Sequence, residues 1–309
     1  MKNDLRERLQ VKPGKKFRLR EYDPDDTAHL QDKDVALAAQ QKNTQKLAEL
    51  HDLLYAEQKH TILIVLQGMD ASGKDGTIKH VMSGVNPAGC AVTSFKVPTA
   101  EEAAHDFLWR IHKEVPRQGY IGIFNRSHYE DVLVTRVHKL IPEEVCKSRY
   151  DRINEFERLL TDNNVLLLKF FLNISKEEQQ CRFDLRKNEA DKNWKISDAD
   201  ARERVFWSDY QEAYQDALSK CSTKYAPWYV IPANKKWFRN LAVSQIIVDA
   251  MQDLKMKYPV RQPAGEPVVP PAADADSHAE KNAKTSTGDD DSPGKSKKNK
   301  RKSRDRAKT

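Results

Sequence analysis

The sequence has 309 residues, of which 39% are hydrophobic and 32% are charged, with a formal net charge of +7. This balance is typical of a globular protein and excludes a collagen-like or wholly disordered chain. The longest apolar runs, Thr61–Leu66 and Val165–Leu172, fall far short of the ~20 residues that cross a bilayer. The four cysteines form no CxxC pair, which favours reduced thiols over a zinc site. We therefore expect a soluble cytoplasmic protein.

Strand-like and helix-like segments alternate between residues 34 and 261. The expected strands are Thr61–Leu66, Ala91–Val97, Tyr120–Phe124, Val165–Leu172 and Trp228–Ile231. The expected helices are Val35–Lys59, one that begins at Thr99 with a capping box to Glu102, Pro142–Asp162, Lys176–Lys187, Asp198–Ser219 and Lys236–Tyr258. This alternation predicts an α/β fold with a parallel sheet of about five strands, covered by helices on both faces.

Composition divides the chain into three parts. Residues 1–33 form a basic N-terminal segment, and residues 34–261 form the main domain, with a helical lid near residues 175–200. Residues 262–309 hold 11 Lys and Arg against 8 Asp and Glu, with few apolar side chains, which predicts a disordered basic tail. Such a tail is either a solubilising extension or a weak capture site for polyphosphate or RNA.

A phosphate-binding loop follows the first expected strand. Residues 68–74, Gly-Met-Asp-Ala-Ser-Gly-Lys, match the G-x-x-x-x-G-K spacing of a P-loop, and a helical pattern follows at once. In this motif, glycines let backbone N–H groups converge on a phosphate, and the helix N-terminus adds positive potential. Lys74 then supplies a mobile positive charge for a phosphoryl oxygen.

Two positions of this loop depart from the common P-loop pattern. Asp75 stands where a Mg²⁺-binding Ser or Thr is usual. Asp70 places a carboxylate inside the phosphate cradle, where it would repel the ligand unless a cation lay between them. A Mg²⁺ ion shared by Asp70 and phosphate oxygens resolves this conflict; the alternative is that Asp70 points to solvent.

A second polar cluster, residues 125–131, follows the third expected strand. Ligands collect at the carboxyl ends of parallel strands, so this cluster should face the P-loop. Arg126 is a candidate phosphate contact, and Glu130 or the adjacent Asp131 is a candidate metal ligand beside Asp70. The residues predicted to bind nucleotide are Asn125, His128 and Glu130, with packing as the competing interpretation of His128.

The expected lid contains two arginines four residues apart on one helical face, Arg182 and Arg186. A mobile lid of this kind carries positive charge onto a transferring phosphoryl group and excludes water. Lys192, Trp194 and Lys195 follow in the same segment. The predicted catalytic residues are Asp70, Lys74, Arg126, Arg182 and Arg186. The further predicted phosphate contacts are Gly68, Met69, Ala71, Ser72, Gly73, Asp75, Gly76, Lys79, Arg136 and Lys187.

The two motifs together, residues 68–76 and 124–131, resemble polyphosphate kinase family 2, in the class that acts on both nucleoside mono- and diphosphates. The resemblance covers roughly residues 12–259 and implies a thymidylate-kinase-like P-loop fold that requires Mg²⁺. It also implies phosphoryl transfer from inorganic polyphosphate to AMP/ADP or GMP/GDP. Asp70 and Glu130 are then the expected metal ligands, and a homo-oligomer is expected.

The terminal phosphate of the acceptor is already largely ionised near neutral pH, since its second pKa is ~6. No strong general base is needed, and direct in-line transfer without a phosphoenzyme is expected. One alternative is an ATP-dependent nucleoside monophosphate kinase on the same fold. The other is a nucleotide-regulated RNA-binding protein, suggested by the basic tail, although no RNA-recognition motif accompanies it. Neither a membrane nor a nucleic acid is an expected partner.

Overall fold

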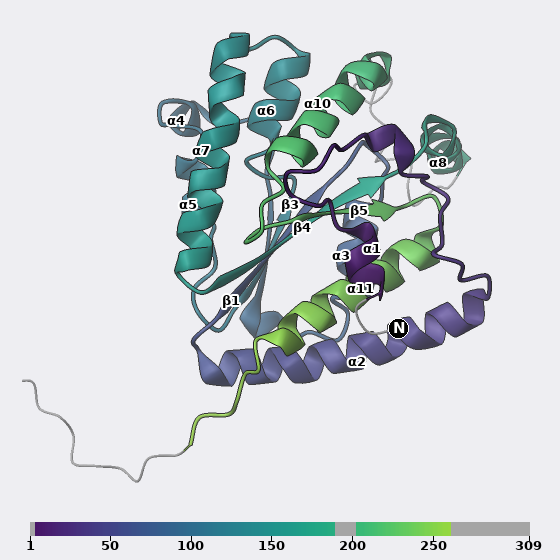
Figure 1. Cartoon of the computed structure of the whole chain (residues 1–309), viewed down its shortest axis with the longest axis vertical. Coiled ribbons are helices and arrows are strands. Elements are labelled where there is room, and N and C mark those ends of the chain that lie inside the picture. The colour runs from purple at the N-terminus through teal and green to yellow at the C-terminus, as the bar shows by residue number, and fades with distance from the viewer. Residues whose placement is uncertain (1–3, 189–201, 261–309) are drawn as a thin grey trace, which may run out of the picture. The chain divides into compact units, whose positions relative to one another are not determined.

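A computed structural model describes residues 4–188 and 202–260. Its centre is a sheet of five parallel strands in the order β2-β3-β1-β4-β5 (Figure 1). The strands are β1 Thr61–Gln67, β2 Cys90–Ser94, β3 Ile121–Asn125, β4 Val165–Asn173 and β5 Trp228–Pro232. Each lies within a few residues of its predicted range, so the expected five-stranded parallel sheet is confirmed.

Strand β1 occupies the middle of the sheet, and every one of its residues is buried. Strands covered on both faces are apolar throughout, which explains the continuous Ile-Leu-Ile-Val-Leu run of β1. Its partners bring two motifs together, because Leu66 pairs with Asn125 of β3, while Gln67 pairs with Phe171 of β4. The P-loop and the 125–131 cluster therefore begin at the same edge of the sheet.

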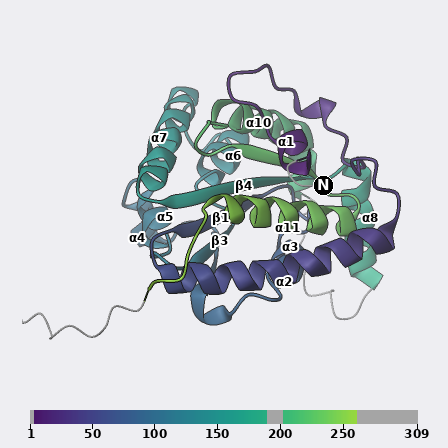
Figure 2. The ribbon, with the colours of Figure 1, turned by 60° about the horizontal axis from the view of Figure 1, so that its bottom comes forward.

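Helices cover both faces of the sheet. On one face lie α2 (Lys33–Glu57), α3 (Lys74–Val81) and α11 (Lys236–Asp253), whereas α6 (Glu130–Val137), α7 (Glu143–Asp162) and α10 (Trp207–Lys220) lie on the other (Figures 1 and 2). Helix α11 is five residues shorter than predicted. The predicted helix Asp198–Ser219 is interrupted by a 3₁₀ turn at Arg204–Phe206, after which α10 continues to Lys220; residues 198–201 lie outside the described part.

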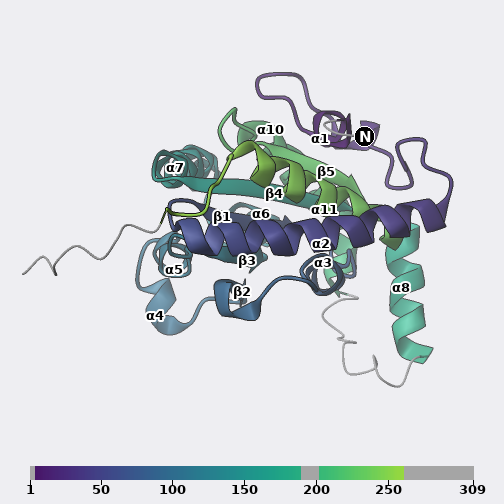
Figure 3. The ribbon, with the colours of Figure 1, turned by 90° about the horizontal axis from the view of Figure 1, so that it is seen from below.

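The remaining elements are short, apart from α8. The Thr99 capping box is present, since the Glu102 N–H donates to the Thr99 hydroxyl and the Thr99 N–H donates to the Glu102 carboxylate. The helix it opens, α4 (Ala100–Ala103), is only one turn long, and α5 (Trp109–Lys113) follows it. Two 3₁₀ turns occur at Leu19–Glu21 and Pro87–Gly89. Helix α8 (Lys176–Asn188) projects from the end of β4 (Figure 3), and Lys192, Trp194 and Lys195 lie outside the described residues.

The N-terminal segment is part of the main domain. Helix α1 (Asp4–Leu9) buries Leu5 and Leu9 in the core, and Gln10 forms a bridge to Tyr229 of β5. A single compact unit extends to Pro259. The predicted tail, residues 262–309, lies outside the described part of the chain. Every helix in residues 4–188 and 202–260 is too short or too polar to cross a lipid bilayer.

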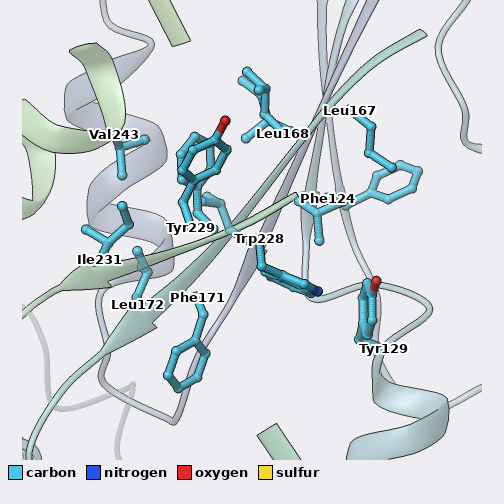
Figure 4. Packing of buried hydrophobic residues seen from close by; sticks show 14 of the residues in the cluster. Phe124, Tyr129, Leu167, Leu168, Phe171, Leu172, Trp228, Tyr229, Ile231 and Val243 are labelled. Carbon is cyan, nitrogen blue, oxygen red and sulfur yellow. The ribbon is translucent and has the colours of Figure 1, made fainter. Parts of the chain in front are cut away.

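Large aromatic side chains fill the space between the sheet and the α6–α7 layer. Trp228 of β5 packs edge to face against Tyr129, with ring centroids 4.7 Å apart (Figure 4). Phe95 and Phe124 meet in the same manner at 4.9 Å. Such pairs add to the stability that area burial provides. They fix the carboxyl end of β3, where the polar cluster begins.

Candidate active site

The P-loop bends through left-handed backbone conformations between β1 and α3. Gly73 has φ of +100° and caps the N-terminus of α3, while Ala71 adopts φ of +62°. A Cβ atom on Gly68 would lie 2.8 Å from the Leu172 carbonyl oxygen, and the φ of this glycine is +153°. Glycine adopts the φ values seen at positions 68 and 73 without the strain that a Cβ atom would add. The loop therefore has the shape that the motif predicts.

Lys74 lies across the loop that precedes it. Its Nζ atom donates to the carbonyl oxygens of Gly68, at 2.8 Å, and Met69, at 3.3 Å. Burial lowers the pKa of Lys74, an effect that Asp70 partly opposes. The protonated form is therefore short of solvation, which favours interaction with a phosphate anion.

Arg126 joins the two motifs electrostatically. Its Nη2 atom donates to Asp70 Oδ1 at 2.9 Å, and its Nη1 atom lies 3.4 Å from Glu130 Oε2. The Asp70 side chain is 28% exposed and the Glu130 side chain 16% exposed. Burial raises the pKa of Glu130, although Arg126 and Lys74 lower it in part. The Asp70 carboxylate therefore faces the Arg126 side of the site and does not simply point to solvent.

The backbone of Arg126 explains how its side chain reaches the loop. The residue has φ of +63°, which is uncommon for a residue with a side chain, and its N–H donates to the Leu66 carbonyl oxygen at 3.1 Å. Arg126 precedes helix α6, which begins at Glu130 and contains Arg136. Strained backbone of this kind is common at functional sites.

Asn125 and Asp75 form a further link between the motifs. The Asn125 Nδ2 atom donates to Asp75 Oδ1 at 2.8 Å. Asp75, in the place of the usual Ser or Thr, thus ties the first turn of α3 to the end of β3. This bond is compatible with Asn125 near a nucleotide, but it assigns both side chains a role in holding the two motifs together.

The structure contradicts the prediction that His128 lines a nucleotide pocket. Its side chain is fully buried, and its Nε2 atom lies 3.2 Å from Glu157 Oε1. Glu157 also accepts a bond from the Tyr129 hydroxyl at 2.7 Å and forms an ion pair with Lys169 of β4. Burial would raise the pKa of Glu157, but Lys169 and His128 lower it. His128 therefore belongs to a buried ionic cluster with Tyr129, Glu157 and Lys169.

Arg182 is also placed differently from the prediction. It is 5% exposed, and its Nη1 atom donates to the carbonyl oxygens of Ala71, at 2.8 Å, and Ser72, at 3.0 Å. Its Nε atom donates to Glu178 at 2.7 Å. The guanidinium therefore binds the carbonyl oxygens of the P-loop. The predicted contact of Arg182 with the substrate is not what the structure shows. Arg186, one turn farther along α8, lies against the Phe183 ring at 5.7 Å and is only partly buried.

The other predicted phosphate-binding residues are dispersed. Arg136 pairs with Asp216 at 2.8 Å, and Lys187 pairs with Asp184 at 3.3 Å. Lys79 lines a separate open groove of about 920 Å³ between α2, α3 and α11. None of the three lines the cavity that contains Asp70, Arg126 and Glu130. Gly76, in the first turn of α3, lies beside a residue that the sequence analysis did not select, Arg239.

The cavity around Asp70 has walls that sequence analysis missed. They include Gln179, Glu203, Arg204, Tyr210 and Tyr214. Gln179 donates to the Asp70 carbonyl oxygen at 2.9 Å and accepts from Arg204 at 2.9 Å, and Tyr210 donates to Glu203 at 2.7 Å. Burial raises the pKa of Tyr214, and the Glu130 carboxylate raises it further. The four-residue spacing of the two tyrosines was the only sequence signal for a shared face.

The donor set at this site fits a magnesium ion bound together with phosphate. In residues 4–188 and 202–260, no three His, Cys, Asp or Glu side chains form a ready-made metal site. Magnesium is usually held by one or two carboxylates plus substrate phosphates and waters, so a full protein cage is not required. Asp70 and Glu130 flank the same guanidinium and provide two such carboxylates.

A P-loop at a helix N-terminus, with a lysine, an arginine and two carboxylates at the carboxyl edge of a parallel sheet, defines a P-loop phosphotransferase. Residues 29–259 match the family described as Polyphosphate kinase 2 (PPK2). The chain belongs to this family, as the two sequence motifs predicted, and the prediction that the protein is a kinase is confirmed with it.

Curated relatives and a solved structure agree with this membership. The chain is 51% identical over 263 residues to the AMP/ADP-polyphosphate phosphotransferase of Meiothermus ruber, covering 85% of this chain and 98% of that protein. It is 48% identical over 232 residues to the ADP-polyphosphate phosphotransferase of Rhodopseudomonas palustris, covering 71% and 80% respectively. The crystal structure of polyphosphate kinase 2 from Arthrobacter aurescens TC1 matches with a TM-score of 0.82 at 41% identity, covering 85% of this chain and 94% of that one.

Proposed function

We propose that this chain transfers a phosphoryl group from inorganic polyphosphate to AMP and ADP, or to GMP and GDP, in a magnesium-dependent reaction. The observation that carries the proposal is the Asp70–Arg126–Glu130 ion-pair series beside Lys74. It brings an in-loop carboxylate, absent from the common P-loop pattern, against a cationic cradle. Family membership and the names of the similar proteins support polyphosphate as the donor.

The chemistry assigned to the chain's own residues is positioning and charge neutralisation. Lys74 and Arg126 bind oxygens of the transferring group, and the P-loop N–H groups orient the donor phosphates. The acceptor phosphate is already ionised and attacks in line, so no residue needs to remove a proton or carry the phosphoryl group. Arg186 is the remaining lid arginine that could contact the transferring phosphoryl group, since Arg182 donates to carbonyl oxygens of the P-loop.

Asp70 and Glu130 are the residues proposed to hold magnesium. When bound, the metal neutralises phosphate charge and polarises the phosphoryl oxygens. Arg126 now pairs with both carboxylates, and we expect its guanidinium to turn toward phosphate when the site is filled. The ion pairs are partly exposed, so their exchange costs little free energy compared with that of a buried pair.

The test of the donor is a reaction without ATP. Purified protein is mixed with polyphosphate, Mg²⁺ and AMP, ADP, GMP or GDP, and the nucleotide products are separated by chromatography. Formation of ADP and ATP, or of their guanine counterparts, supports the proposal. Turnover of AMP with ATP but not with polyphosphate would instead establish the nucleoside monophosphate kinase. A phosphohistidine formed from polyphosphate alone would contradict direct transfer.

The binding of a long polyanion should also depend on ionic strength. Each neutralised phosphate releases counterions, so the affinity for polyphosphate should fall steeply as salt is raised, by analogy with nucleic acids. The proposed contacts, Lys79, Arg136 and Lys187, lie outside the Asp70 cavity and are expected to matter for long chains more than for tripolyphosphate. An affinity that stays flat between about 50 and about 200 mM salt, over which a protein with several phosphate contacts loses orders of magnitude in affinity, would exclude this electrostatic groove.

A further inference from the structure

Two arginines approach the P-loop from behind, and the second of them, Arg239 of α11, has no role in the reaction described so far. Its side chain is 3% exposed, and its Nη1 atom donates to the Ser72 carbonyl oxygen at 3.3 Å. Arg182 of α8 donates to the same oxygen at 3.0 Å. One side chain from helix α8 and one from helix α11 thus reach the same loop carbonyl oxygen; both helices and α3 are labelled in Figure 3.

The loop is built around this guanidinium. A Cβ atom at position 73 would lie 1.9 Å from Arg239 Nη1, and one at position 76 would lie 3.4 Å from Arg239 Nη2. The positive φ of Gly73 favours glycine, and the missing Cβ atom leaves the space in which the Arg239 guanidinium lies. The turn of the P-loop that points its N–H groups at a phosphate rests directly on the Arg239 side chain.

The charge of Arg239 is not matched by a carboxylate. Within residues 4–188 and 202–260, Arg239 takes part in no ion pair, and its Nε and Nη2 atoms donate to the neutral Asn240 Oδ1 at 3.1 and 2.8 Å. Arg182 differs, because Glu178 accepts from it at 2.7 Å. Burial, and to a lesser extent Arg182, lowers the pKa of Arg239 to about 10. A buried cation without a counter-ion is costly.

We propose that Arg239 is a positioning residue for the donor: its unmatched positive charge, held behind Ser72 and Gly73, is balanced by the phosphate anion on the front of the P-loop. This inference rests on the proposed function. Positive charge fixed behind a loop of low dielectric raises anion affinity without touching the anion. The phosphate chain then serves as the counter-ion that residues 4–188 and 202–260 do not supply, and Arg239 also keeps the loop in its binding shape.

The sharpest test is Asn240→Asp. The substitution keeps the size of the side chain and turns the acceptor of two Arg239 hydrogen bonds into a carboxylate. The fold should gain a buried ion pair and melt at the same or a higher temperature. Because the charge behind the loop is then neutralised, Kd for Mg²⁺-tripolyphosphate, measured by calorimetry at fixed ionic strength, should rise roughly tenfold.

Two substitutions at position 239 complete the test. Arg239→Lys keeps the charge and should bind tripolyphosphate within about threefold of the wild-type affinity, whereas Arg239→Met should lose about tenfold or more. Arg110→Met is the matched control. Arg110 is also a buried arginine, but it pairs with Asp131 and does not support the P-loop. This substitution should lower the melting temperature and leave the tripolyphosphate Kd within twofold.

The outcomes separate this inference from the function on which it rests. If the wild type binds tripolyphosphate and Asn240→Asp binds it equally well, the electrostatic role of Arg239 is wrong and the polyphosphate donor stands. If the wild type does not bind tripolyphosphate at all, the donor assignment and this inference both fail. Should Arg239→Met not fold, Asn240→Asp and Arg239→Lys still decide the question.

Discussion

Two ionic clusters arise from one short stretch of chain, residues 125–131, and they differ in almost every physical respect. Arg126 and Glu130 pair with each other and with Asp70 in a partly exposed site. His128, in contrast, points into the core and joins Glu157 and Lys169, whose side chains are all fully buried.

The difference shows that polar residues close together in the sequence can have different functions, one in binding and one in stability. A partly exposed ion pair is worth only about 0–1 kcal/mol, so its members can exchange partners when a phosphate or a metal arrives. A buried pair cannot be opened without leaving an uncompensated charge, at a cost of several kcal/mol. The first cluster is therefore suited to binding, and the second to holding the end of β3 in one place.

The largest effect is expected at the exposed cluster, from Lys74→Met. Loss of the ammonium should lower kcat/KM with polyphosphate by about 10³-fold, or about 4 kcal/mol. The free energy of unfolding should change little, because the hydrogen bonds of Lys74 within the described residues go to two loop carbonyl oxygens. Steady-state kinetics and urea denaturation measure the two quantities, with the surface change Lys147→Met as control. A loss of activity that follows a loss of folding would contradict the assignment.

In the buried cluster, Lys169→Met should lower the stability of the fold and leave the activity nearly unchanged, the reverse of Lys74→Met. Removing the cation leaves the Glu157 carboxylate buried and unpaired, which should cost about 3–5 kcal/mol of folding free energy. The kcat of the protein that remains folded should be close to normal. The double substitution Lys169→Met/Glu157→Gln should recover part of the loss in urea denaturation. An unstable single variant that the second change does not rescue would argue against a shared cluster.

A smaller loss is predicted for Asp70→Asn. The substitution keeps the size of the side chain and removes one proposed metal ligand, so kcat should fall about 10²-fold, or about 3 kcal/mol. Half-maximal activity should also need more Mg²⁺, which a magnesium titration measures. Full activity with an unchanged magnesium dependence would mean that the in-loop carboxylate does not hold the metal.

The raised pKa of Glu130 predicts that Glu130→Gln is more stable than the wild type at high pH. Burial raises this pKa above its usual value of 4.5, so the folded state binds the proton more readily than the unfolded state does. The ionised carboxylate therefore destabilises the fold as pH rises through the raised pKa. Glu130→Gln should melt at a higher temperature than the wild type at pH 8, with less activity, and the difference should vanish below pH 4.5. Thermal melts that show no such convergence would contradict the raised pKa.

The smallest effect is expected from truncation after Arg261. Both clusters lie within residues 4–260, and the tail outside the described residues carries only a small excess of positive charge. Activity with tripolyphosphate should stay within about twofold of the full-length value, since short donors reach only the P-loop site. A parallel assay with long polyphosphate decides between a solubilising tail and a weak capture site, because only the removal of a capture site would lower the affinity for long chains.

Sequence reasoning located the sheet and the P-loop because their signals are local. The apolar run of β1, the glycines at 68 and 73 and the following helical pattern all lie within about twenty residues. Reasoning was less successful for the lid and for the phosphate contacts. Arg182 and Arg186 share a helix face by spacing, but spacing does not say that Arg182 reaches the carbonyl oxygens of Ala71 and Ser72.

The sequence by itself determined the α/β architecture, the family and the residues that enter the P-loop, because each depends on periodicity or on a contiguous motif. Tertiary structure alone decided which side chains of residues 125–131 face the site, through the positive φ of Arg126 and the fully buried partners of His128. It also decided that Arg239, more than 160 residues beyond the loop, lies against Ser72. Long-range packing sets these directions, and no local pattern encodes them.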